Sequence, residues 1–128
     1  QPNYSGLTTE IAIKMGAIGA EMLSGQSPTS AKVAYNAFNG EVTISATTVS
    51  GRANAGFTLV FSGLSKEACV QMASSDWGSG SGSGLVSVQA GTATAGTTAS
   101  GTLPLNLATA AGGCNQEGDA NKVTWVYY

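Results

Sequence analysis

Two cysteines, Cys69 and Cys114, are the feature that most restricts how this chain can fold. They form an even pair in a chain rich in Thr, Ser and Gly, in which only 9 % of residues are charged. This setting is typical of an exported protein with one disulfide. Such a bridge would close a long loop and contribute ~4 kcal/mol of stability through the entropy of the unfolded chain. The alternative is two separate buried thiols. The pair lacks Cys-x-x-Cys spacing, which argues against zinc binding and thioredoxin-type redox chemistry.

The length and charge of the chain restrict its class further. With 128 residues it is one domain. Its five cationic residues are scattered, which argues against binding to nucleic acid or to an anionic membrane. No apolar run reaches the length of about 18 residues that a membrane span needs. The first residue is Gln and no signal peptide is present, so we expect the native N-terminus to lie upstream of residue 1.

The N-terminal part carries apolar residues at helical spacing, namely Leu7, Ile11, Met15, Ile18 and Met22. The spacing predicts a helix over 8–16, with Thr8 or Thr9 as its N-cap. Gly16 and Gly19 weaken the second half, so an irregular continuation is expected. We expect this apolar stripe to pack into the core; a binding surface is the alternative.

Strand signals follow along the chain. Alternating or β-branched runs predict strands over 41–45, 57–61, 85–88, 103–107 and 123–128. The first two are separated by a glycine-containing segment, 51–56, that is expected to turn. The pattern of the stretch 90–101 allows two interpretations, a weak strand or a long surface loop. Residues 110–113 are expected to turn the chain before Cys114.

A second helix is predicted over 66–74, which places Cys69 on it. Ser65 is its expected N-cap, and Leu64 is expected to pack on Cys69 one turn later. Two short helices and five or six mostly antiparallel strands give an α+β fold class.

Residues suited to catalysis are scarce. The chain has no His, so it lacks the usual general base and the commonest metal ligand. Its seven carboxylates fall in expected helix surfaces or loops, where solvated acids are the simpler interpretation: Glu10, Glu21, Glu41, Glu67, Asp76, Glu117 and Asp119. A weak calcium site at Glu117 and Asp119, with Asn115 and Asn121, is the alternative to a polar turn, but the spacing is not that of an EF-hand. We therefore predict no enzyme, cofactor or metal.

Aromatic residues offer one further possibility. Trp77 lies in a polar segment followed by glycines, where its ring would either stack on a sugar or close the core; we favour the core. Strand alternation puts Trp125 and Tyr127 on one face and Val126 and Tyr128 on the other. A secreted carbohydrate-binding or adhesin module using such rings is one alternative function.

Four stretches, in this order, resemble a type IV pilin of the b subclass. They are residues 4–9 running into the first helix and Met22, the turn 36–40, the segment 63–69 with Cys69, and Cys114 with the closing strand 122–127. The resemblance implies an αβ-roll in which the sheet packs on a long N-terminal helix. That apolar helix, through which pilins assemble, is not among these residues.

The resemblance also implies how the single domain, 1–128, is divided. Residues 7–37 would form the helix and αβ-loop region, and 38–68 the first strands. The segment 69–114 would be a disulfide-bounded D-region, and 115–128 the C-terminal strand.

The function implied by the resemblance is that of a structural subunit. It would polymerise into a bacterial surface filament for adhesion, aggregation or conjugation, and be anchored in the inner membrane through the preceding helix before assembly. Its partners would be copies of itself in a helical filament, the pilus assembly machinery and a host or neighbouring cell surface. The stretch 7–23, with Leu7, Ile11 and Met15, would contact the region Cys69–Cys114 of a neighbour. A minor pilin or a pseudopilin of a secretion system is a further alternative.

Overall fold

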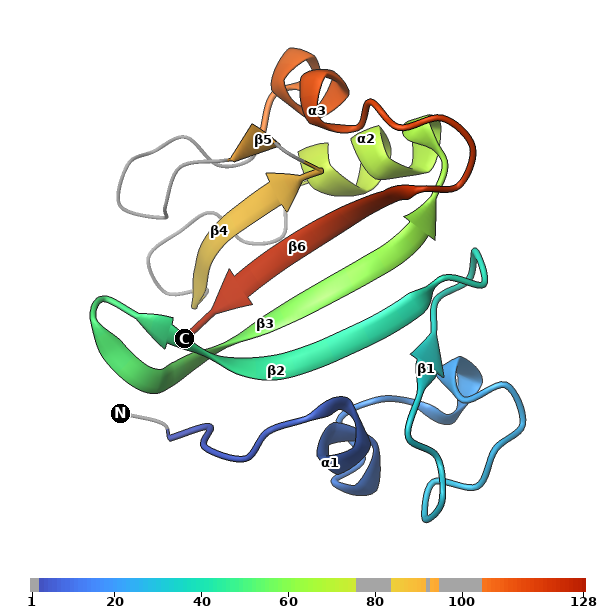
Figure 1. The fold of residues 1–128 in the computed structure, drawn as a ribbon, viewed down its shortest axis with the longest axis vertical. Helices are drawn as coiled ribbons and strands as arrows, with labels where there is room; N and C mark the ends of the chain where they lie inside the picture. The colour runs from blue at the N-terminus through green and yellow to red at the C-terminus, as the bar shows by residue number, and fades with distance from the viewer. Residues whose placement is uncertain (1–2, 76–83, 92, 95–104) are drawn as a thin grey trace.

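The computed structural model describes residues 3–75, 84–91, 93–94 and 105–128. They form one antiparallel sheet of six strands, in the order β1-β2-β3-β6-β4-β5, with short helices beside it (Figure 1). In chain order the elements are α1 (Thr9–Lys14), the 3₁₀ helix η1 (Ala20–Met22), β1 (Ala34–Tyr35), β2 (Glu41–Val49), β3 (Arg52–Leu64), α2 (Lys66–Ser74), β4 (Leu85–Ala90), β5 (Ala93–Thr94), α3 (Leu107–Gly113) and β6 (Asn121–Tyr127). The α+β class is confirmed.

The C-terminal strand β6 lies inside the sheet rather than at its edge. It pairs with β3 on one side, where Trp125 is opposite Leu59, and with β4 on the other, where Trp125 is opposite Val88. This position explains why 123–128 is the strongest β-forming run of the sequence, since an inner strand is in contact with neighbours along both edges.

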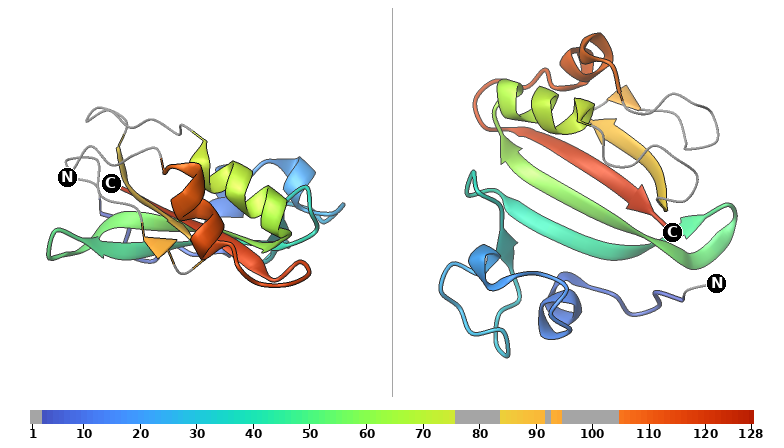
Figure 2. Two further views of the ribbon diagram at one scale, coloured as in Figure 1. Left: turned by 90° about the horizontal axis from the view of Figure 1, so that it is seen from above. Right: turned by 180° about the vertical axis from the view of Figure 1, so that it is seen from behind.

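The two faces of the sheet differ in chemistry. Paired positions such as Ile44 and Leu59 put the apolar side chains of β2, β3 and β6 on one face, while Ser45 and Thr58 pair on the opposite, hydroxyl-rich face. The described helices contact the apolar face, as the view from behind shows for α2 (Figure 2).

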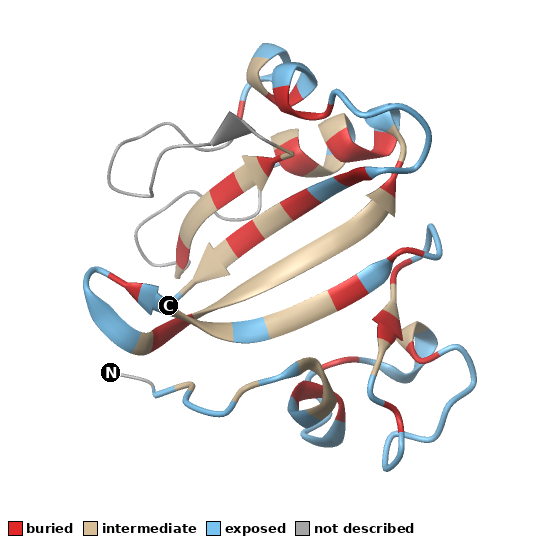
Figure 3. Cartoon of the chain, in the orientation of Figure 1, coloured by how far each residue is buried: buried red, intermediate tan, exposed pale blue. Residues whose placement is uncertain are grey.

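Two clusters of buried side chains make the core. One joins α2, α3, β4 and β6 and includes both cysteines. The other joins α1, η1, β1 and the start of β2. Leu59 and Phe61 of β3 lie between the clusters, contact both, and are themselves only half-buried (Figure 3). The middle of the apolar face is therefore less covered than its two ends.

Most predicted elements are confirmed. Helix α2 has the predicted bounds, and the hydroxyl of Ser65 accepts a hydrogen bond from the backbone N–H of Ala68 at 3.1 Å. The prediction of a turn over 51–56 was wrong, because β3 already begins at Arg52. The turn is made by Ser50 and Gly51, with φ of 53° and 77°. Positive φ at two successive residues is the geometry of the tightest hairpin turns, and it leaves 52–56 free to pair.

The strand predicted over 103–107 was also wrong where the structure describes it. Leu107 begins α3, and the predicted turn 110–113 is the end of this helix. The side-chain oxygen of Asn106 accepts a hydrogen bond from the N–H of Thr109 at 2.7 Å. This N-cap and the alanines that follow outweigh the alternation of leucines. Pro104, Trp77, Asp76 and most of 90–101 lie outside the described residues.

The expected burial of the N-terminal stripe is confirmed for Ile18, which is buried, and for Leu7 and Met22, which pack against the core. It was wrong for Ile11 and Met15. Helix α1 ends at Lys14, and Gly16 has a φ of +78°, so no single helix carries the whole stripe. Ala12 and Ile13 are the buried residues of α1, whereas 40 % of Ile11 and 70 % of Met15 are exposed. The hydroxyl oxygen of Thr9 accepts a hydrogen bond from the N–H of Ile44 at 3.2 Å. This contact with the edge of β2 helps to fix which side of α1 meets the sheet.

Candidate interaction surfaces

The disulfide lies between two helices. Cys69 is in α2 and Cys114 directly follows α3; the two sulfurs are bonded, and the cysteines lie 45 positions apart in sequence. Both residues are at most 2 % exposed. The structure thus contains a bridge rather than two separate thiols, and the bridge holds α3 against α2.

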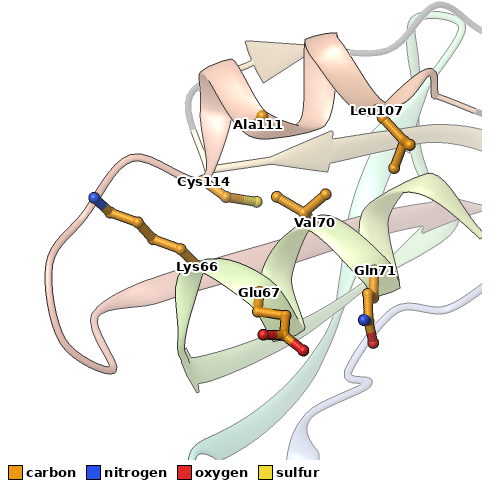
Figure 4. Close-up of a pocket in the computed structure, with 7 residues that line it drawn as sticks. All are labelled: Lys66, Glu67, Val70, Gln71, Leu107, Ala111 and Cys114. Carbon is orange, nitrogen blue, oxygen red and sulfur yellow. The ribbon is translucent and has the colours of Figure 1, made fainter.

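A groove runs between α2 and α3, beside the disulfide. It is a hollow of about 440 Å³, and the residues that line it are Lys66, Glu67, Val70, Gln71, Leu107, Ala111 and Cys114 (Figure 4). Val70 and Leu107 give the groove its apolar walls, and 66 % of Leu107 is exposed. The charged ends of Lys66 and Glu67 point away from it. We call this surface the α2–α3 groove; it is suited to an apolar partner side chain.

An ion pair braces one end of the α2–α3 groove. The Nζ atom of Lys66 lies 2.7 Å from Oε1 of Glu117 in the loop before β6. The hydrogen bond and the charge of Lys66 lower the pKa of the Glu117 carboxyl from its ordinary value of 4.5. Because the pair is exposed to solvent, its effect on stability is small and depends on salt.

A second surface lies on α1. Leu7, Ile11 and Met15 line a hollow of about 190 Å³ together with the preceding segment 3–6. The structure therefore brings these three predicted contact residues together, and α1 lies at the opposite end of the sheet from α3 (Figure 1). Lys14 and Glu10 form an ion pair of 3.3 Å on the same helix. We call this surface the α1 patch.

A third surface is the uncovered middle of the apolar sheet face, a hollow of about 420 Å³ that we call the central groove. Side chains of β2 and β3 form its floor and the segment 17–22 forms a wall; the lining residues are Ala17, Ile18, Gly19, Glu21, Met22, Val42, Ile44, Phe57, Leu59 and Phe61. Phe57, Leu59 and Phe61 alternate in the strand predicted over 57–61 and so share one face, but the groove was not predicted. The available signal was a face of large apolar side chains that two short helices are too small to cover.

Comparison with known proteins shows which family this chain belongs to and which solved structure it is similar to. A family model described as the N-terminal part of PilS matches residues 1–128. The chain belongs to the PilS N-terminal family. Among solved structures it is similar to the crystal structure of a type IVb pilin from Salmonella typhi, with a TM-score of 0.64 and 20 % identity over 91 % of this chain and 75 % of that chain. A search of curated proteins found no significant match. The resemblance to type IVb pilins is confirmed.

Two aromatic side chains of β6 in this PilS-family domain, Trp125 and Tyr127, pack against other aromatic rings. Trp125 is 3 % exposed and meets Phe61 edge-on at 5.3 Å between ring centroids. Tyr127 stacks on Phe57 at 5.3 Å. Neither Trp125 nor Tyr127 offers a free platform for a sugar. Trp77 lies outside the described residues.

The polar turn considered for calcium has a structural role in the PilS-family domain. Asn121 is buried, and its amide nitrogen donates to the backbone oxygens of Leu64 and Gln116 at 3.2 and 2.9 Å. Its side-chain oxygen accepts from the N–H of Gln116 at 2.9 Å. These bonds use Asn121 to brace the loop. Among the described residues, no three His, Cys, Asp or Glu side chains are grouped so that they could hold a metal ion.

Within the described ranges, none of the helices has the length and apolar character needed to cross a lipid bilayer.

Proposed function

We propose that this domain is the head of a subunit that polymerises into a type IVb pilus, and that an apolar helix preceding residue 1 lies in the central groove. The observation that supports this is the groove itself. Phe57, Leu59 and Phe61 stand side by side along β3 and stay half-exposed, although both ends of the same face are covered. Covering these apolar side chains with an apolar partner would remove them from water, which is favourable.

The energetics favour a helix as the occupant. Each 100 Å² of apolar surface that a helix covers contributes about 2.5 kcal/mol. The apolar side of one helix would face the floor of the groove on β2 and β3 and the wall formed by the segment 17–22. Such a helix would lie in the same layer as the described helices, between the two core clusters. Its remaining length would bundle with those of other subunits by apolar burial.

We further propose that the α1 patch of one copy contacts the α2–α3 groove of the next. The two surfaces carry Met15 and Leu107, the most exposed large apolar residues described, and they lie at opposite ends of the sheet. A contact between two different surfaces does not close on itself, so it produces an open helical array. Glu10 and Lys14 on the patch, and Lys66 and Glu67 beside the groove, allow pairs of opposite charge at the rim of such a contact.

The test is the N-terminal sequence and mass of the protein recovered from filaments sheared off the source cell. The proposal expects a processed start, about 20 apolar residues, and then this domain. High abundance in the sheared fraction identifies the main subunit, whereas trace amounts identify a minor pilin. A protein without the apolar segment, or its absence from every filament fraction, overturns the proposal in favour of a secreted binding module.

A further inference from the structure

We propose that Tyr4 joins the N-terminal segment to β3 and to the end of β6, so that tension from the preceding segment passes into these strands and does not pull the α1 patch off the sheet. We call the contacts of Tyr4 the clasp. The inference rests on the proposed function, because tension arises at the N-terminus only if that segment holds the domain in a filament. The clasp itself is a property of the isolated domain and is testable there.

The contacts of Tyr4 tie it to two strands at once. Its backbone N–H donates to the carbonyl oxygen of Asn54 in β3 at 2.9 Å, and its hydroxyl donates to the backbone oxygen of Tyr128 at 3.0 Å. Its ring meets Phe57 edge-on at 5.2 Å, and Phe57 in turn stacks on Tyr127 of β6. One residue near the N-terminus is therefore joined to the β2–β3 hairpin and to the end of β6.

The chain after Tyr4 reaches the sheet through short elements. Helix α1 has six residues, η1 has three and β1 has two. Gly6, with a φ of +82°, separates Tyr4 from α1. Without the clasp, tension would reach the segment that carries these elements directly and would load the core cluster that they share with the start of β2.

The direction of the force explains why the clasp resists. Strands β3 and β6 are antiparallel neighbours with five consecutive paired positions from Phe57 to Phe61. A force that enters at Tyr4 and acts along these strands loads several hydrogen bonds of the ladder together. A force that enters at α1 loads the contacts of the segment 7–35 in sequence. Tyr4 lies upstream of that segment and diverts the force from it.

Single-molecule stretching tests the clasp. One handle is fused before residue 1, and the other is attached through an azide-bearing amino acid at the exposed Asp119, just before β6. In the wild type we expect no separate early event. In Tyr4→Ala we expect an early event at lower force that releases the chain between Tyr4 and Ala34, about 10 nm at ~3.5 Å per residue.

Two further variants make the result specific. Tyr4→Phe keeps the ring but loses the hydrogen bond to Tyr128, and should open at intermediate force. Tyr35→Phe removes a hydroxyl from β1 instead, and should behave like the wild type. An early 10 nm event in the wild type, or none in Tyr4→Ala, overturns the clasp and leaves the filament role untouched. If the clasp is present but sheared filaments lack the protein, the proposed function fails and the clasp remains a structural feature only.

Discussion

Cys69 and Cys114 have their Cα atoms 5.8 Å apart, although they lie 45 positions apart in sequence. Their bridge holds α3 on α2, and it thereby shapes the α2–α3 groove. Removing the bridge by reduction should lower the free energy of unfolding by up to about 4 kcal/mol. The melting temperature should fall by roughly 10 °C or more, measured by calorimetry with and without reductant. An unchanged melting temperature would show that the packing of the helices, and not the bridge, holds this region together.

A charge in the central groove should prevent assembly. Leu59→Lys places an ammonium group where the proposed helix packs, and an unpaired buried charge costs several kcal/mol. Since about 1.4 kcal/mol corresponds to a tenfold change in an equilibrium, the yield of sheared filaments should fall at least tenfold. The matched control is Thr58→Lys, one residue earlier on the hydroxyl-rich face, which should assemble. Thermal melting of both isolated domains checks that each is folded; equal yields from both would refute helix packing in the groove.

The contact between copies predicts paired effects at Met15 and Leu107. Met15→Glu and Leu107→Glu should each reduce the filament yield, because each puts a charge into an apolar contact. Combining Met15→Glu with Leu107→Lys should restore part of the yield, since the two charges then pair across the interface. Ser45→Glu, on the opposite face of the sheet, is the control. If the double variant assembles no better than the single ones, these surfaces do not meet.

The ion pair between Lys66 and Glu117 predicts a pH-dependent contribution to stability. The pKa of Glu117 is lowered in the folded protein, so the contribution is present above the ordinary value of 4.5 and is lost as the pH falls through the lowered pKa. Glu117→Gln should therefore lower the melting temperature slightly at pH 7 and leave it unchanged at pH 2. Added salt should reduce the difference. Glu41→Gln, which removes an exposed carboxylate of β2, is the control. If Glu117→Gln changes the melting temperature equally at pH 7 and pH 2, the ion pair with Lys66 is not the cause of the effect.

The close backbone contact at Gly40 predicts that a side chain at this position would disturb the turn 36–40. A Cβ at this position would lie 1.8 Å from the carbonyl oxygen of Ser62, so Gly40→Ala should lose at least ~2 kcal/mol through the displaced turn. The buried Asn36 binds the same oxygen at 2.9 Å and would be displaced with it. Gly112→Ala in α3 has open space around its Cβ and should gain ~0.5–1 kcal/mol from helix propensity. Denaturant unfolding of both variants measures the difference; equal stabilities would show that the turn adapts without cost.

Local signals in the sequence correctly predicted several elements. Ser65, Leu64 and the apolar spacing after them fixed α2 to the residue, because a cap and a staple act within one helical turn. Alternation at 41–45 and 57–61 identified the inner face of the sheet, because successive side chains of any strand point to opposite sides. The partner of Cys69 followed from there being only one other cysteine in the chain.

The tertiary structure decided the rest. The cap at Asn106, which starts α3 at Leu107, is a local signal that the alternation of leucines obscured, whereas the place of α3 against α2 depends on the disulfide between distant residues. The buried side of α1 follows from its contact with the edge of β2, through a bond between Thr9 and Ile44 that spans 35 residues. The position of β6 between β3 and β4 placed the apolar faces of distant strands side by side and left the central groove between two clusters. Sequence determines what each segment favours alone, whereas a surface built from three or four segments exists only once long-range pairing has set their order.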